Sequence, residues 1–273
     1  MPLLFFAGLV LAVAAWLWGP PLWAAWCRAR IVRQPFPAAW REVLRQRWPY
    51  FRRLPPDLQL QLKKHIQVLV AEKPFIGCNG LQVTDEMRVL VAAQAALLLL
   101  NRGAGYFRGL HQILLYPGPF VVERPVNVGG VTQEARRVLS GESWQQGQVI
   151  LSWDDVLAGA ASADDGQNVV IHEFAHRLDQ ETGAANGAPW LGRAERYTAW
   201  SAVLGRAYAR LQQQLADGEE PLVDAYGATD PAEFFAVVSE VFFEQPQRLA
   251  EGDPALYREL AGFYRVDPLA WRP

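Results

Sequence analysis

The sequence predicts a helix-dominated α+β domain with a small sheet, preceded by an N-terminal transmembrane helix. Three observations support this fold class. The first 27 of the 273 residues carry no charged side chain. Seven later segments have apolar patterns typical of helices, and three short apolar runs bounded by turn residues are typical of strands.

The N-terminal segment is predicted to be a membrane anchor over residues 1–27. Leu3–Trp18 is nearly all apolar, and Leu22–Trp26 continues the run after Gly19-Pro20-Pro21. About 20 apolar residues span a bilayer, so the first run is slightly short and the two together suffice. A cleaved signal peptide is the alternative, but such peptides normally begin with Lys or Arg, which are absent here.

The charges that follow the apolar run predict its orientation. Arginines occupy positions Arg28, Arg30, Arg33, Arg41, Arg45 and Arg47. Because positive charge stays on the cytoplasmic side, we expect a single-pass protein of the inner (cytoplasmic) membrane with its main domain in the cytoplasm; an unanchored cytoplasmic protein is the alternative. The predicted division is an anchor over 1–27, a basic juxtamembrane segment over 28–54 and a folded domain over 55–273.

Composition narrows the classes of function. The formal charge is −2, so bulk electrostatics favour no nucleic-acid partner. Two cysteines, Cys27 and Cys78, form neither a disulfide framework nor a CxxC pair. Roughly 240 residues behind the anchor are enough for one large core.

The elements of the domain are expected in the following order. Helices are predicted near 37–48, 56–72, 84–101, 166–182, 191–216, 231–244 and 254–264. Strands are predicted at Gln112–Tyr116, Phe120–Glu123 and Gln148–Ser152, and the stretch from Arg124 to Gly141 is expected to be a loop with a short helix.

The pentad His172-Glu173-Phe174-Ala175-His176 is the strongest chemical signal in the chain. Two histidines four residues apart on a helix project from the same face, one turn above the other. Their imidazoles can share one Zn²⁺, and a Glu beside the first histidine can reach a metal-activated water. The pattern predicts a zinc peptidase site; its alternative is a buried helix with two hydrogen-bonded histidines.

The surroundings of the pentad favour a helix. Asp164-Asp165-Gly166 offers capping residues upstream, and Gly183 and Gly187 mark the end. Asp179 lies on the same helical stripe as the two histidines, so it could accept a hydrogen bond from a ligand histidine. The alternative for Asp179 is a solvated polar residue.

Zinc needs a third protein ligand. His65 and His111 are far upstream, and Asp179 and Thr182 occupy the glycine and histidine positions of the HExxHxxGxxH pattern. A carboxylate from a later helix is the remaining common solution.

Two glutamates on that later helix can supply the carboxylate. Glu233 and Glu240 share a face of the predicted helix, whose N-cap is Asp230 and whose first residue is Pro231. Glu233 also has the spacing of a capping box with Asp230, so the residues alone leave both glutamates open.

Four segments together resemble the MtfA family, Mlc titration factor A, a family of zinc metallopeptidases. They are Ile113–Val122, Gly141–Gly147, Ile171–Asp179 and Asp224–Glu240, within a similarity that covers about residues 38–270. The resemblance implies a zincin-like fold and a transcriptional regulator as a partner. The family is also similar to the catalytic domain of anthrax lethal factor, in which a tyrosine stands seven residues before the glutamate ligand. That spacing matches Tyr226 and Glu233.

The resemblance therefore implies one Zn²⁺ held by His172, His176 and Glu233, with Tyr226 as a transition-state donor and Glu240 in a supporting role. Glu173 would move the proton in hydrolysis of a peptide or protein substrate. This predicts a gluzincin-type metallopeptidase, either an endo- or an aminopeptidase.

The alternative function is a zinc-stabilised binding module that sequesters a transcriptional regulator. The strand at 148–152 is expected to be an edge strand that pairs with an extended peptide; its alternative is a buried strand of the sheet.

Overall fold

The fold is described from a computed structural model, which covers residues 2–103, 105–128, 131–139, 141–144, 147–183 and 185–271. The helices are α1 (Pro2–Val32), α2 (Ala38–Arg47), α3 (Pro56–Glu72), α4 (Asp85–Leu97), α5 (Trp153–Ala161), α6 (Val169–Asp179), α7 (Ala194–Asp217), α8 (Pro231–Glu244), α9 (Pro246–Gly252) and α10 (Pro254–Tyr264). The strands are β1 (Phe75–Gly77), β2 (Gln112–Tyr116), β3 (Phe120–Val128), β4 (Val131–Leu139), β5 (Gly141–Trp144) and β6 (Gln148–Ser152).

The main sheet has the strand order β1-β2-β6-β5. Strands β1, β2 and β6 are parallel, whereas β5 runs antiparallel to β6, with Gly141 opposite Leu151 and Trp144 opposite Gln148. The expected edge strand at 148–152 is therefore an inner strand between β2 and β5, and that prediction was wrong. Its residues Val149 and Leu151 are fully buried, which fits a strand paired on both sides.

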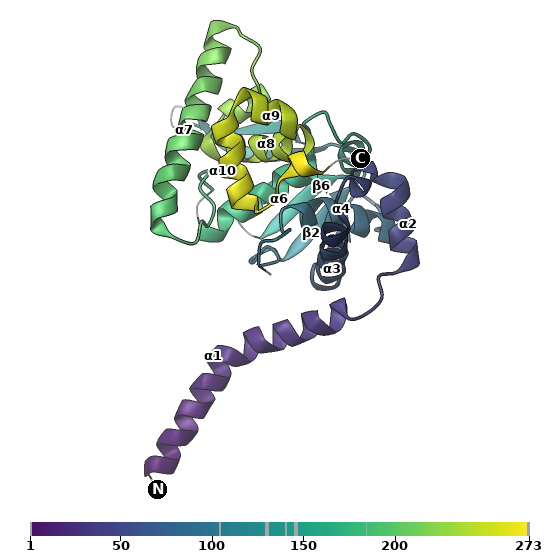
Figure 1. The fold of residues 1–273 in the computed structure, drawn as a ribbon, viewed down its shortest axis with the longest axis vertical. Coiled ribbons are helices and arrows are strands. Elements are labelled where there is room, and N and C mark those ends of the chain that lie inside the picture. The colour runs from purple at the N-terminus through teal and green to yellow at the C-terminus, as the bar shows by residue number, and fades with distance from the viewer. Residues whose placement is uncertain are drawn as a thin grey trace.

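Helices pack around this sheet in two groups (Figure 1). Helices α2, α3 and α4 lie on the N-terminal side of the domain, and α7 to α10 form the C-terminal group. Helix α6 contacts α8, α4, β5 and β6. Helix α4 is buried almost throughout, and Phe235, Phe242 and Tyr264 are fully buried in the C-terminal group. This central position gives α6 fixed neighbours on several sides.

Helix α1 extends away from the rest of the chain (Figure 1). Its last turns contact α3, where Arg28 forms a bidentate ion pair with Glu72 at 2.7 and 2.9 Å. Pro20 and Pro21 lie inside the helix, and an internal proline removes a backbone hydrogen bond and bends a helix.

The predicted transmembrane anchor at residues 1–27 was wrong. Within the described part of the chain, no helix combines the length and the apolar character that a bilayer span requires. The uninterrupted apolar run stops at Trp18, short of the roughly 20 residues needed, and the continuation holds two prolines and several tryptophans. The single-pass inner-membrane location, its orientation and the membrane contact are withdrawn with it; the domain boundaries after residues 27 and 54 stay a prediction.

Two further expectations differ from the structure. The stretch from Arg124 to Gly141, expected as loop and short helix, belongs mainly to β3 and β4, which pair as an antiparallel hairpin. Helix α5 was not expected, although Ser152 caps it by accepting the Asp155 amide and two aspartates occupy its first turn. These are ordinary signals of a helix start.

Candidate metal centre

Helix α6 presents the two histidines of the pentad on one face. Asn168 begins the helix, because its side-chain oxygen accepts the Ile171 amide at 3.0 Å. The expected capping segment 164–166 lies just upstream of that cap. The Nε2 atoms of His172 and His176 are 3.2 Å apart, so both imidazoles point to the same place.

Helix α8 brings Glu233 to the same point. Asp230 caps this helix by accepting the amides of Ala232 and Glu233, and Pro231 is its first residue, as predicted. The Glu233 carboxylate turns away from the cap: its Oε2 atom lies 3.0 Å from His172 Nε2 and 3.2 Å from His176 Nε2. The main contacts of the Glu233 side chain are therefore with the two histidines, and not with the helix N-terminus as in a capping box.

These three atoms suit a small cation. Within the described residues, His172, His176 and Glu233 form the group of side chains that could hold a metal ion. Around a tetrahedral Zn²⁺ with bonds of about 2.0–2.1 Å, ligand atoms lie about 3.3–3.4 Å apart. The observed separations of 3.0, 3.2 and 3.2 Å are close to that spacing. An ion held by three protein atoms would keep its fourth position for a water or substrate, as in catalytic sites.

Glu240 contacts the outer side of His172. Its Oε1 lies 2.7 Å from His172 Nδ1, and its Oε2 accepts the Asn168 amide at 2.5 Å. A carboxylate that accepts a hydrogen bond from Nδ1–H keeps the proton of a neutral imidazole on Nδ1, so the Nε2 lone pair can bind a metal. Of the two glutamates left open by the sequence, Glu233 faces both Nε2 atoms and Glu240 orients one ring.

The charges in the cluster are mutually stabilising. Burial alone would raise the pKa of Glu233, but hydrogen bonds with His172 and His176 hold that pKa well below its usual range. Burial opposes protonation of His172, whereas its contacts with Glu233 and Glu240 raise its pKa. The site thus has the electrostatic character of a cation-binding centre even before an ion is considered.

Glu173 is buried beside the cluster, with 5 % of its surface exposed. Within the described chain, its Oε2 atom has no hydrogen-bond partner. Burial raises the pKa of the Glu173 carboxyl to about 7, although the two histidines oppose the rise. A buried carboxyl with an uncommitted oxygen and a pKa near neutrality can both accept and donate a proton.

Tyr226 lies beside His172 and is partly exposed. It belongs to a short 3₁₀ turn, Ala225–Ala228, which Asp224 begins by accepting the Tyr226 amide at 2.7 Å. Its ring centre is 6.1 Å from that of His172, and 46 % of its surface is exposed. The seven-residue spacing seen in the sequence therefore corresponds to a tyrosine beside the histidines.

Three buried polar residues that the sequence analysis did not single out support the cluster. The Asn168 amide group donates to Gln94 Oε1 at 2.8 Å and to Glu244 Oε1 at 2.9 Å. Glu244 Oε2 accepts the Gly166 amide at 3.2 Å. Glu244 stands four residues after Glu240 in an apolar helix, and that spacing of two acids on one face was the available signal.

Asp179 is fully buried at the other end of α6 and accepts the Gly187 amide at 2.7 Å. It is therefore not a solvated polar residue. Its predicted hydrogen bond to a ligand histidine stays a prediction.

Comparison with known proteins gives the family. Residues 23–265 match the family described as "Glucose-regulated metallo-peptidase M90". The chain belongs to this family. An uncharacterised protein of Synechocystis sp. is 40% identical over 263 residues, 96% of each chain.

Several relatives of this M90 member carry the name Mlc titration factor A. The one from Yersinia enterocolitica is 35% identical over 237 residues, 85% of this chain and 87% of that protein. The one from Serratia proteamaculans is 41% identical over 206 residues, 74% and 78% respectively. The resemblance to the MtfA family is confirmed, and membership of a metallopeptidase family implies a metal.

Proposed function

We propose that this M90 family member is a zinc-dependent peptidase whose centre is formed by His172, His176 and Glu233. The observation that carries the proposal is the convergence of three ligand atoms within 3.2 Å of one another beside a buried glutamate. A metal bound there would supply Lewis acidity, which acidifies water and polarises the scissile carbonyl.

The side chains around the centre have complementary roles in this proposal. Glu173 accepts a proton from the attacking water and passes it to the leaving amine. Tyr226 donates a hydrogen bond to the carbonyl oxygen as that oxygen becomes negative. Glu240 orients His172 through Nδ1 and does not touch the substrate.

Metal content and hydrolysis test the proposal together. We expect about one zinc per wild-type chain, with loss of zinc in Glu233→Ala and retention in Glu219→Ala, a matched change at an exposed glutamate. Glu173→Gln should keep its zinc and lose hydrolysis of unstructured protein substrates by about 10²- to 10⁴-fold. Hydrolysis by Glu173→Gln at the wild-type rate would exclude the assigned base.

The type of peptidase is tested with paired substrates. A gluzincin-type aminopeptidase would cleave amino-acid p-nitroanilides and spare peptides with a blocked N-terminus, whereas an endopeptidase would cleave the blocked peptides. The same purified wild-type protein serves both assays.

The names of the relatives favour a second candidate function, binding of a transcriptional regulator of the Mlc type. Binding and hydrolysis can be separated, because the zinc-loaded Glu173→Gln protein should bind such a regulator as tightly as the wild type. Absence of binding by titration calorimetry for both proteins would exclude this second function.

A further inference from the structure

A large cavity opens at the C-terminal end of α6. Its volume is about 1270 Å³, and Arg177, Leu178 and Gln180 line it from the helix. Gln180 follows His176 by four residues, which is about 6 Å along the helix axis. One lining residue of the cavity therefore stands about one helical turn after a proposed ligand on the same helix.

Positive charge is concentrated in this cavity. Five of its 19 lining residues are arginines and one is a glutamate, a net charge of +4 in a chain whose formal charge is −2. The charged residues are Arg102, Arg108, Arg177, Arg196, Arg265 and Glu181. A partly enclosed space lined by one sign of charge attracts ligands of the other sign.

Neighbouring groups fix the inner arginines in place. The Arg102 guanidinium donates to the Phe263 carbonyl at 2.8 Å and lies 3.9 Å from the centre of the Phe263 ring. Arg177 is 95 % buried, since only 5 % is exposed, and it hydrogen-bonds Gln180. Guanidiniums held in this way lose little side-chain entropy when they bind a carboxylate.

The walls leave room for a main chain. Six lining residues are glycines, among them Gly109 and Gly147 with φ of +80° and +81°. A Cβ atom at Gly103, Gly183 or Gly192 would meet no other atom within 4 Å, so the space at these glycines is open. Gly147 directly precedes Gln148, the first residue of β6, which pairs with Trp144 of the outer strand β5.

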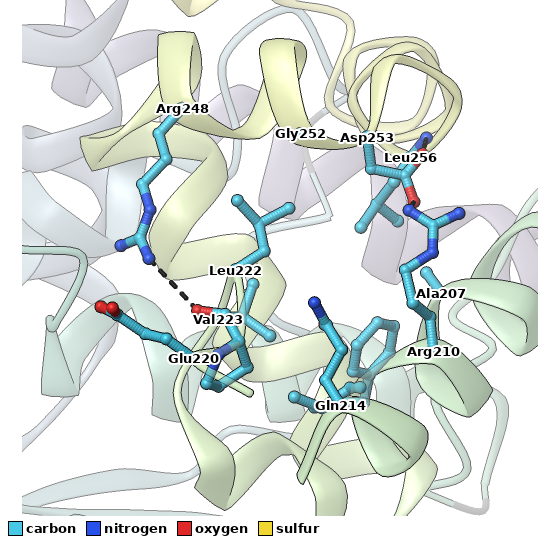
Figure 2. A pocket seen from close by; sticks show the side chains of 13 residues that line it. Ala207, Arg210, Gln214, Glu220, Leu222, Val223, Arg248, Gly252, Asp253 and Leu256 are labelled. Carbon is cyan, nitrogen blue, oxygen red and sulfur yellow. Dashed lines mark hydrogen bonds and ion pairs between the residues drawn. The ribbon is translucent and has the colours of Figure 1, made fainter. Parts of the chain in front are cut away.

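A second cavity provides the contrast (Figure 2). It measures about 450 Å³ and lies among α7, α9 and the segment before Tyr226. Arg210 pairs there with Asp253 at 3.2 Å, and Arg248 donates to the Pro221 carbonyl at 3.3 Å. With Glu220 as a second acid, its two arginines are balanced. The charges of this second cavity are therefore balanced, whereas the cavity beside α6 has an excess of arginine.

We propose that the arginine-lined cavity binds acidic side chains of the peptide substrate and gives the enzyme a preference for Asp and Glu near the scissile bond. This inference rests on the proposed peptidase function, whose substrate class it names. A carboxylate is the ligand that matches the guanidinium fork in charge and shape. The glycine-lined wall admits the peptide backbone that carries it.

Paired blocked peptides that differ only in Glu or Gln within four residues of the scissile bond test the preference. We expect kcat/KM of the zinc-loaded full chain to be about tenfold higher for the Glu peptides, a ratio equivalent to about 1.4 kcal/mol. The ratio should fall as salt rises, because screening weakens exposed charges. An equal kcat/KM for both series would overturn the proposal.

Arginine variants test whether the cavity is the source of that preference. Arg108→Gln and Arg196→Gln should each reduce the Glu/Gln ratio of kcat/KM several-fold. Arg248→Gln, the same change in the second cavity, is the control and should keep the ratio. Loss of the preference in Arg248→Gln alone would place the anion site elsewhere and overturn the proposal.

Binding to Glu173→Gln separates this inference from the proposed function. Trp190 lines the cavity and is 62 % exposed, so its fluorescence can report occupancy. Tighter binding of the Glu peptides, lost in Arg196→Gln, supports the carboxylate site even if no peptide is ever cleaved. Inorganic phosphate that binds while Glu and Gln peptides bind equally would mark a small-anion site and overturn the peptide assignment.

Discussion

The two ends of α6 differ in how they are held. At the N-terminal end, Asn168, Gln94, Glu240 and Glu244 form a buried network in which α8 and α4 contact the start of the helix. At the C-terminal end, Arg177 and Gln180 line a cavity of about 1270 Å³. A buried hydrogen-bond network therefore holds the N-terminal end of α6, whereas the C-terminal end borders a large cavity.

The largest expected effect is the loss of stability when the Asn168 cap of α6 is removed. Asn168→Ala loses the helix cap, about 0.5–2 kcal/mol, and leaves buried groups of Gln94 and Glu244 without a partner, about 1–3 kcal/mol. We expect the free energy of unfolding to fall by about 3 kcal/mol in urea titrations. Thr84→Ala, which removes an exposed cap from α4, should cost about 1 kcal/mol. Equal losses of unfolding free energy in the two variants would mean that the buried network around Asn168 adds nothing to stability.

The pH dependence of the free energy of unfolding should reveal that Glu244 is protonated in the folded state. Burial, with the carboxylates of Asp165 and Glu240 adding to it, raises the pKa of Glu244 to about 9. Because the unfolded pKa is about 4.3, the folded state keeps a proton that the unfolded state releases. Its stabilising contribution is complete below the unfolded pKa and is lost as pH rises toward 9, with a slope of up to about 1.4 kcal/mol per pH unit.

Glu244→Gln sharpens that measurement, because the amide keeps the neutral form at every pH. We expect the free energy of unfolding of the metal-free variant, measured in urea, to change less with pH than that of the metal-free wild type between pH 5 and 9. Parallel curves for the two proteins would contradict a protonated Glu244.

Glu240→Gln should weaken metal binding without touching a ligand atom. The glutamine side chain has one acceptor oxygen where Glu240 has two. Its NH₂ group, a donor, would therefore face either His172 Nδ1 or the backbone N–H of Asn168. We expect zinc affinity to fall by about 10- to 100-fold in competition with a chelator. An affinity unchanged from the wild type would show that Glu240 does not orient His172.

The smallest effect on stability is expected at the C-terminal end of α6, beside the cavity. Gln180→Ala removes the acceptor of the Arg177 hydrogen bond and should lower the free energy of unfolding by less than about 1 kcal/mol. Zinc affinity should stay within about twofold of the wild type. A tenfold loss of affinity would show that both ends position the ligands.

Local signals in the sequence predicted much of the fold. Helices over 56–72, 231–244 and 254–264 have the predicted boundaries, because each starts with a proline in its first turn. The spacing of the pentad likewise predicted that His172 and His176 share a face. These features depend on residues within a turn or two of one another.

Long-range contacts explain most of what was missed. Asn168, Glu244 and Gln94 meet across 74 to 76 residues of sequence, so no local pattern links them. The anchor failed for a different reason: composition near the N-terminus was apolar, but the run was too short and was interrupted by two prolines. The sequence of the strand at 148–152 suits an inner strand and an edge strand equally well. Its inner position follows only from its pairing with β5.

The separation of the two ligand-bearing helices also has a consequence for synthesis. His172 and Glu233 are 61 residues apart, and a ribosome adds about 5–20 residues per second. The histidines therefore precede the glutamate by about 3–12 s. During that interval a nascent chain holds two of the three proposed ligands, so it lacks a complete centre. The proposed centre can therefore form only after the ribosome has added Glu233.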